Sequence, residues 1–127
     1  MLAPATILIL DDDPLHLQLY SWMMKKEGYN ALGALVGSDS VELPEAQPID
    51  LVLLDYRLNS SLTAREVAAI VKEKFAGATI IVLSELPWPP DDIKDFAAAF
   101  VNKGDPAILM RSIASHIAAR SETNRGI

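Results

Sequence analysis

The sequence predicts an α/β domain built on a five-stranded parallel sheet with helices on both faces. Three short apolar runs, at 6–10, 51–54 and 79–83, are rich in β-branched residues and typical of strands buried on both sides. Segments with the apolar spacing of amphipathic helices lie between the strand candidates, so strands and helices alternate along the chain. Such alternation favours right-handed crossovers and a doubly wound sheet.

The first predicted helix follows the strand at 6–10. It begins at Pro14, directly after the candidate capping residue Asp13, and ends before Gly28. Its apolar residues repeat at i, i+4, i+7 and i+8, and we expect this stripe to face the core: Leu15, Leu19, Trp22 and Met23.

The middle of the chain carries weaker signals. A second strand is expected at 31–36. The segment 38–44 begins like a helix but reaches Pro44 too soon, so the second helix is expected to be short or irregular. A third helix, capped by Thr63, is expected to end near Gly77.

The last third of the chain completes the alternation. Asp91 is the candidate cap of a fourth helix, and a brief fifth strand is expected at 99–101. A fifth helix begins at Pro106 and is expected to end at Arg120. The predicted domain therefore covers residues 4–120, followed by a frayed tail at 121–127.

Length and composition narrow the class of protein. The chain has 127 residues, 50% of them hydrophobic, which is enough for one core without disulfides or a structural metal. It contains no cysteine, which excludes thiol catalysis and thiolate metal sites and fits the cytoplasm. No apolar run approaches the roughly 20 residues needed to span a bilayer, so we expect no membrane association. A formal charge of −6 opposes binding to a nucleic acid backbone.

Polar residues stand at the ends of four predicted strands. Asp11, Asp12 and Asp13 follow the first strand, Asp55 follows the third, Ser84 the fourth, and Lys103 comes directly after the fifth. The carboxyl ends of parallel strands meet at one edge of a sheet, so we expect these side chains to converge. Of the three successive aspartates, the last is better interpreted as the helix cap than as a metal ligand.

Converging carboxylates repel one another unless a cation offsets their charge. Mg²⁺ is suited to this, because it is usually held by one or two carboxylates together with phosphate oxygens. Phosphoryl transfer needs an in-line nucleophile and positive groups around the phosphoryl oxygens. Asp55 as nucleophile, Mg²⁺, Lys103 and the Ser84 hydroxyl would supply these parts.

Four motifs in order along the chain resemble a known family: ILILDDDP at 7–14, DLVLLDYRL at 50–58, IIVLS at 80–84 and FVNK at 100–103. They are similar to the successive motifs of response-regulator receiver domains, which have a flavodoxin-like fold. The DYRL form after the third strand is especially similar to receivers attached to hybrid histidine kinases.

The resemblance implies that Asp55 accepts a phosphoryl group from a histidine kinase or a histidine phosphotransfer protein. It also implies the ligands of Mg²⁺: Asp12, Asp55, the backbone carbonyl of Arg57 and, through water, Asp11. Lys103 and Ser84 would contact the phosphoryl oxygens, and Ser84 would act with Phe100 as a switch that changes a partner-binding surface. We expect a monomer or weak homodimer that is not an enzyme, beyond assisting its own phosphorylation and dephosphorylation.

Two other functions are compatible with the sequence. One is a pseudo-receiver that binds proteins without phosphorylation, because Glu85 and Gly104 replace residues common at these positions in the family and the loop at 59–64 lacks the usual glycine. The other is a phosphatase or phosphotransferase with an aspartyl nucleophile, which would need a hydroxyl residue after its Asp-x-Asp pattern and an added cap domain. In this chain Asp11 and Asp13 form such a pattern, but the residue that follows is Pro14 rather than a hydroxyl residue, and no segment is available for a cap domain.

Overall fold

A computed structural model describes residues 4–125 and contains one parallel sheet in the order β2-β1-β3-β4-β5. Its strands are β1 (Thr6–Asp11), β2 (Asn30–Leu35), β3 (Leu51–Asp55), β4 (Thr79–Ser84) and β5 (Ala99–Asn102). The helices are α1 (Pro14–Lys26), α2 (Ala64–Lys74) and α3 (Pro106–Arg125), with a short 3₁₀ turn, η1 (Asp91–Ile93). The predicted α/β class and the five-stranded parallel sheet are confirmed.

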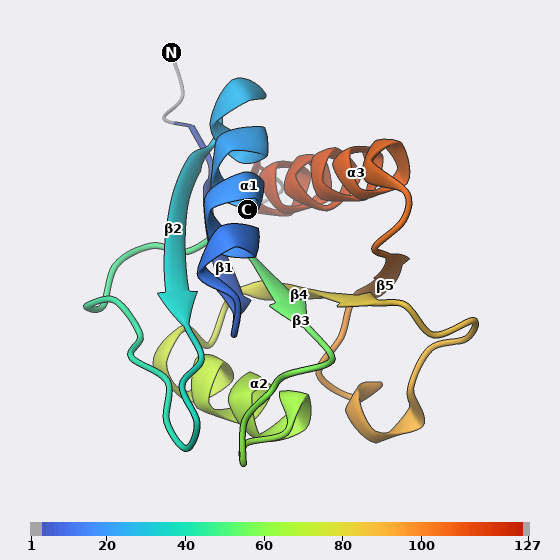
Figure 1. Cartoon of the computed structure of the whole chain (residues 1–127). Coiled ribbons are helices and arrows are strands. Elements are labelled where there is room, and N and C mark those ends of the chain that lie inside the picture. Colours follow the sequence, from blue (N-terminus) through green and yellow to red (C-terminus); the bar gives the residue numbers. More distant parts are fainter. Residues whose placement is uncertain (1–3, 126–127) are drawn as a thin grey trace.

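Helices cover both faces of the sheet, as expected for strands that are apolar throughout. α1 and α3 lie on one face and α2 on the other (Figure 1). Alternate residues of β1 divide between the two layers: Ile7 and Ile9 pack on the side of α1 and α3, whereas Leu8 and Leu10 pack on the side of α2. The central strand β3 is buried along its whole length. The apolar runs therefore form a core on each face of the sheet.

The core-facing side of α1 differs from the prediction. Met24 is fully buried, with three partly buried residues beside it, but the predicted stripe is largely exposed, with Leu15 72%, Leu19 52% and Trp22 58% accessible. Of that stripe, only Met23 packs against the core; the other core-facing residues are Leu17, Tyr20 and Met24. α1 carries apolar residues on several sides, so its periodicity alone did not identify the buried face.

The prediction of five helices is also wrong, because the described residues contain three α-helices. The segment at 38–44 forms no helix; an isolated bridge joins Val36 to Val41, and Gly37 N–H donates to the Ser40 carbonyl at 2.8 Å. This region is irregular, as expected from Pro44.

The expected fourth helix is only the 3₁₀ turn η1. Its capping position is Pro90 rather than Asp91, and this residue makes no side-chain capping bond. Ile93 of η1 is fully buried and anchors the turn to the α2 side of the sheet. Tyr56 and Arg65 hold the same region at the surface, through a 2.9 Å bond from the Tyr56 hydroxyl to Asp92 and a bidentate pair of Arg65 with Asp95.

The other helices follow the sequence signals more closely. Thr63 caps α2 in a capping box with Glu66, as predicted for its first residue. α3 begins at Pro106 as predicted but continues to Arg125, beyond the expected end at Arg120. Of the expected tail, 126–127 lies outside the described residues. No helix in the described part of the chain is long and apolar enough to cross a membrane.

The corrected orientation of α1 can be tested by two substitutions. Met24→Ala should lower the free energy of unfolding by about 2–4 kcal/mol, because it leaves a cavity beneath α1. Leu19→Ala, on the outer side, should change it by less than about 0.5 kcal/mol. Urea unfolding at neutral pH measures both values. Equal losses for the two variants would contradict the orientation described here.

Candidate functional site

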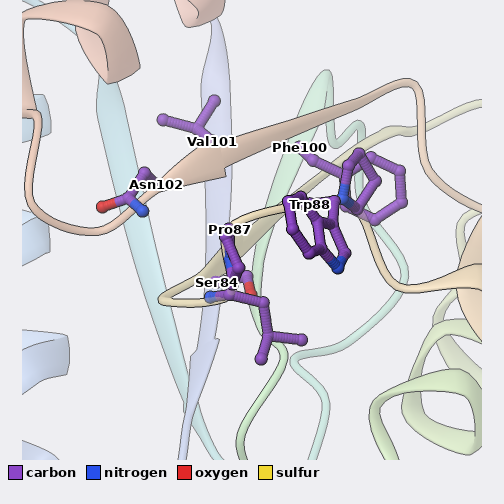
Figure 2. A pocket seen from close by; sticks show the side chains of 8 residues that line it. Ser84, Pro87, Trp88, Phe100, Val101 and Asn102 are labelled. Atoms are coloured by element: carbon purple, nitrogen blue, oxygen red, sulfur yellow. The ribbon is translucent and has the colours of Figure 1, made fainter.

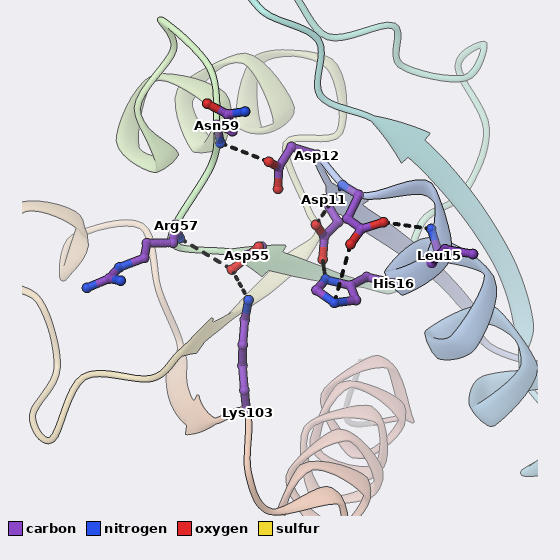
Figure 3. A network of polar contacts seen from close by, with 9 residues as sticks. Asp11, Asp12, Leu15, His16, Asp55, Arg57, Asn59 and Lys103 are labelled. Atoms are coloured by element: carbon purple, nitrogen blue, oxygen red, sulfur yellow. Dashed lines mark hydrogen bonds and ion pairs between the residues drawn. The ribbon is translucent and has the colours of Figure 1, made fainter.

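Three carboxylates converge at the carboxyl ends of β1 and β3. Asp11, Asp12 and Asp55 each offer an oxygen, and these oxygens lie within 4.8 Å of one another. Asp11 and Asp55 are buried, with 1% and 3% of their surface exposed, whereas Asp12 is half-buried. The cluster faces the start of α1 and the loop after β3 (Figure 3). The structure therefore brings together the acidic residues predicted from the strand ends.

Backbone N–H groups donate hydrogen bonds to the two carboxylates at the end of β1. Asp13 N–H donates to Asp11 Oδ1 at 3.0 Å, and Asn59 N–H donates to Asp12 Oδ2 at 3.0 Å. Asp13 itself accepts a bond from Leu15 N–H and caps α1, as predicted. The contact of Asn59 was not predicted, because 47 residues separate it from Asp12.

Lys103 lies against Asp55. Its Nζ is 2.6 Å from Asp55 Oδ1, and the backbone N–H of Arg57 donates to the same oxygen at 3.3 Å. Burial lowers the pKa of Lys103, but the hydrogen bond to Asp55 and the nearby carboxylate charges outweigh this and hold the pKa above its ordinary value. The lysine therefore stays charged at neutral pH.

The pKa of Asp11 is raised from 3.8 to about 6. Burial is the main cause and the neighbouring Asp55 and Asp12 carboxylates add to it, whereas the Asp13 N–H and His16 oppose the shift. Asp11 Oδ2 is buried and has no hydrogen-bond partner among the described residues. His16 Nδ1 lies 3.4 Å from this oxygen. Sequence reasoning assigned His16 no part in the site, although its i+3 spacing from Asp13 places both at the start of α1.

The donor set fits a hard divalent cation. Three carboxylates face one lysine, so the cluster has an excess of negative charge, and within the described chain the buried Asp11 Oδ2 accepts no hydrogen bond. All three donors are oxygens, which Mg²⁺ prefers, and none is a thiolate. Mg²⁺ is therefore compatible with the residues present.

Ser84 and Phe100 lie outside the cluster, on β4 and β5. Ser84 is buried at the end of β4, and its hydroxyl accepts a hydrogen bond from Leu86 N–H at 3.0 Å. Both residues line a pocket of about 200 Å³ together with Trp88 (Figure 2). The two predicted switch residues thus share one cavity, while Glu85, which follows Ser84, is exposed.

Tyr20 is a further residue beside the site that sequence reasoning missed. Burial raises the pKa of its hydroxyl, and the charge of Lys103 partly lowers it. Tyr20 lies on the inner side of α1 one turn after His16, and the two rings make an edge contact with centroids 6.5 Å apart. This inner side was not identified from the sequence, so Tyr20 could not be assigned to the site.

Comparison with protein families gives a match over residues 7–103 to the response regulator receiver domain. The chain belongs to this family. GlrR, a transcriptional regulatory protein of Escherichia coli strain K12, is 28% identical to the receiver domain over 90 residues, which cover 71% of this chain and 20% of GlrR. YvrH, a transcriptional regulatory protein of Bacillus subtilis strain 168, is 26% identical over 118 residues, which cover 89% of this chain and 49% of YvrH. The receiver domain thus spans half or less of these relatives.

Solved structures agree with this assignment. The response regulator TrrA of Thermotoga maritima, crystallised in complex with Mg²⁺-BeF, has a TM-score of 0.71 at 26% identity, covering 88% of this chain and 98% of that chain. A CheY-like receiver domain protein of Methanospirillum hungatei JF-1 has a TM-score of 0.75 at 20% identity, covering 94% and 98%. The predicted resemblance to receiver domains is therefore confirmed.

The raised pKa of Asp11 predicts an unusual pH dependence of stability without divalent cations. The folded state binds the Asp11 proton more tightly than the unfolded state, so this residue's contribution falls as pH rises from about 4 to about 6. Asp11→Asn keeps the acceptor for Asp13 N–H and removes the charge. It should stabilise the apo protein by about 1–3 kcal/mol at pH 7 and by much less at pH 4.

Urea unfolding in a chelator at both pH values measures this difference. The same experiment with Mg²⁺ serves as a control, because the cation should stabilise the wild type more than the variant. A difference between the two proteins that does not change with pH would contradict the role assigned to the Asp11 charge.

Proposed function

We propose that this receiver domain accepts a phosphoryl group on Asp55, with Mg²⁺, from a histidine kinase or a histidine phosphotransfer protein, and that the modification alters a partner-binding surface. The observation that carries the proposal is the convergence of three carboxylates within 4.8 Å, with Lys103 2.6 Å from the Asp55 carboxylate. This arrangement combines a nucleophile, a cation site and a fixed positive charge.

In the proposed reaction, an Asp55 oxygen attacks the phosphorus of a phosphohistidine. The P–O bond forms as the P–N bond breaks, and the imidazole nitrogen keeps the electron pair. Asp11, Asp12, Asp55 and the Arg57 carbonyl would hold Mg²⁺, which when bound neutralises charge on the phosphoryl oxygens. Lys103 moves from the Asp55 oxygen to a phosphoryl oxygen, so its positive charge follows the developing negative charge.

The similar structures support the choice of cofactor and donor. TrrA was crystallised with Mg²⁺-BeF, and another structure, of 24% identity, contains the histidine kinase ThkA in complex with TrrA. The matched relatives are transcriptional regulatory proteins that are longer than this chain. The receiver domain itself has a formal charge of −6, so we assign it protein partners rather than nucleic acid.

The switch would act through Ser84 and Phe100. The Ser84 hydroxyl accepts a hydrogen bond from Leu86 N–H and keeps its own proton, which it would donate to a phosphoryl oxygen after rotating toward Asp55. This movement changes the wall of the pocket that Ser84 shares with Phe100 and Trp88. Trp88 is 75% exposed, so a change in this pocket reaches the surface available to a partner. The domain would act as a cytoplasmic switch and catalyse only its own phosphorylation and dephosphorylation.

Intact-mass spectrometry tests the phosphoacceptor directly. After incubation with Mg²⁺ and acetyl phosphate, the wild type should gain one phosphoryl group, whereas Asp55→Asn should gain none. The reaction should also stop in a chelator. If the wild type binds Mg²⁺ but gains no phosphoryl group from either acetyl phosphate or a phosphorylated histidine kinase, the chain is a pseudo-receiver and the proposal fails.

Glu85 provides a second prediction about the same reaction. Its exposed carboxylate follows Ser84 directly and repels the incoming phosphoryl group. Glu85→Gln should increase the rate of phosphorylation by about twofold to fivefold, the effect of one charge near a solvent-exposed site. Glu73→Gln, in the last turns of α2, is the matched control and should leave the rate unchanged. Equal rates for the wild type and Glu85→Gln, measured by mass spectrometry at low salt, would contradict this role.

A further inference from the structure

The outer edge of β2 lacks the features that normally prevent an exposed strand from pairing. Among the described strands, β2 pairs with β1 alone and forms one edge of the sheet, without a bulge (Figure 1). Neither proline nor a charged residue occurs between Gly28 and Ser38. Soluble proteins usually place charges, prolines or bulges on such strands, because an unpaired backbone can bind another strand. The edge is therefore available for pairing.

The hydrogen bonds of β2 show which backbone groups face this edge. The N–H groups of Asn30 and Val36 donate to carbonyls on the β1 side, each at 2.9 Å. Because successive residues of a strand face opposite edges, Ala31 and Gly33 direct their N–H and C=O groups away from the sheet. The chain returns to this edge at Val36, where an isolated bridge joins it to Val41. The stretch at 30–34 stays open.

Two hollows lie along the open edge. The one beside the first half of β2 has a volume of about 410 Å³ and includes Lys25 in its wall. The one beside the second half has a volume of about 450 Å³ and includes Glu42. Asn30 and Gly33, one in each wall, are exposed. A second strand could therefore approach the outward backbone groups, and it would meet opposite charges at the two ends of the edge.

These charges favour a second copy of the same strand in the antiparallel direction. Lys25, Lys26 and Glu27 stand before β2, so this end is net positive. The chain at 39–45, beyond the other end, carries three acidic residues and no basic one. An antiparallel copy brings Lys25 of each chain to Glu42 of the other, whereas a parallel copy brings like charges together.

The open stretch is symmetrical about Leu32, and this defines the register. An antiparallel pair centred there places Ala31 opposite Gly33 of the second copy, and the two residues exchange N–H···O=C bonds. Leu32 then faces its own copy across the two-fold axis. Its side chain is partly buried against the core on the α2 side of the sheet, so the pair adds an apolar cross-strand contact there.

We propose that two copies of this chain associate through the open edge of β2, with the strands antiparallel and centred on Leu32, so that their sheets become continuous. Each copy uses the same edge, so the association closes at a dimer. The paired stretch is short, and the dimer is therefore weak and reversible. β5 lies at the opposite edge of the sheet, so the pairing leaves the pocket of Ser84 and Phe100 free and goes beyond the function proposed above.

Analytical ultracentrifugation of the whole chain, from about 10 µM to about 1 mM, tests the dimer. Gly33 accepts a side chain, because its φ is not positive and an added Cβ would lie 3.7 Å from Leu17, an ordinary contact. Gly33→Lys and Gly33→Glu should each raise the dissociation constant at least about tenfold, since like charges then meet across the pair. An equimolar mixture of the two variants should dimerise again. Ile108→Lys, on an exposed part of α3, is the control for added charge.

The charges at the ends of the edge give a second test of direction. Lys25→Glu should weaken the dimer, and the double variant Lys25→Glu with Glu42→Lys should restore it. Urea unfolding of each variant checks that it is folded.

Cysteine substitution tests the register, because the chain has no native cysteine. Leu32→Cys should form a disulfide-linked dimer under mild oxidation, since facing residues of a non-hydrogen-bonded pair have Cα atoms about 4.5 Å apart. Asn30→Cys should not, because the antiparallel pair holds its two thiols more than about 10 Å apart along the strands. Ile108→Cys is the control for random collision.

Any one of four results would overturn the proposal. They are a wild type that is monomeric at every concentration, association that continues beyond a dimer, a dimer that Gly33→Lys weakens no more than Ile108→Lys, and equal cross-linking at positions 30 and 32. If the wild type is monomeric and Gly33→Lys instead slows phosphoryl transfer from a histidine kinase several-fold, the edge belongs to that partner. Acetyl phosphate labelling of Asp55 is independent of all these outcomes.

Discussion

The burial of two like charges at the carboxyl ends of adjacent strands is the constraint on which the rest of the site depends. β1 and β3 are neighbours in the sheet, so Asp11 and Asp55 are brought together by the same backbone pairing that builds the core. Among the described residues, Lys103 is the lysine or arginine that contacts the cluster, and it directly follows β5 at the edge of the sheet. A divalent cation would balance the remaining charge, so the strand pairing that builds the fold also creates the conditions for metal binding.

The sheet and the acidic cluster could be predicted from the sequence because each depends on strong local signals. A strand that is apolar until its last residue and then ends in aspartate places that carboxylate at the sheet edge in any parallel arrangement. Lys103 could be placed by the same logic, since it follows the last strand. The contacts of His16 and Asn59 depend on the exact start of α1 and the course of the loop after β3, which no periodicity specifies.

The helices were harder to predict because their local sequence signals conflict: apolar residues lie on more than one side of a helix, and capping residues occur where no helix forms. α1 has apolar residues on opposite sides, and only the contact with the sheet determines that Met24 faces inward. Between β4 and β5 a single 3₁₀ turn forms although Asp91 looks like a helix cap, because the capping position is Pro90, which has no side-chain acceptor for the first N–H groups. The extension of α3 to Arg125 lacks a hydrophobic signal, because the added residues are mainly polar.

The short connection between β4 and β5 is also the part of the domain that we expect to unfold locally at the lowest free energy. Apart from the buried Ile93, much of η1 is held by solvent-exposed polar contacts, including Tyr56 with Asp92 and Arg65 with Asp95. Such contacts contribute little free energy in water, so the segment forms a unit of low local stability beside a rigid sheet. We expect amide hydrogens in this segment to exchange with solvent by local unfolding, while the five strands stay paired. Because Tyr56 directly follows Asp55, its exposed bond to Asp92 places this segment one residue from the carboxylate that we propose accepts the phosphoryl group.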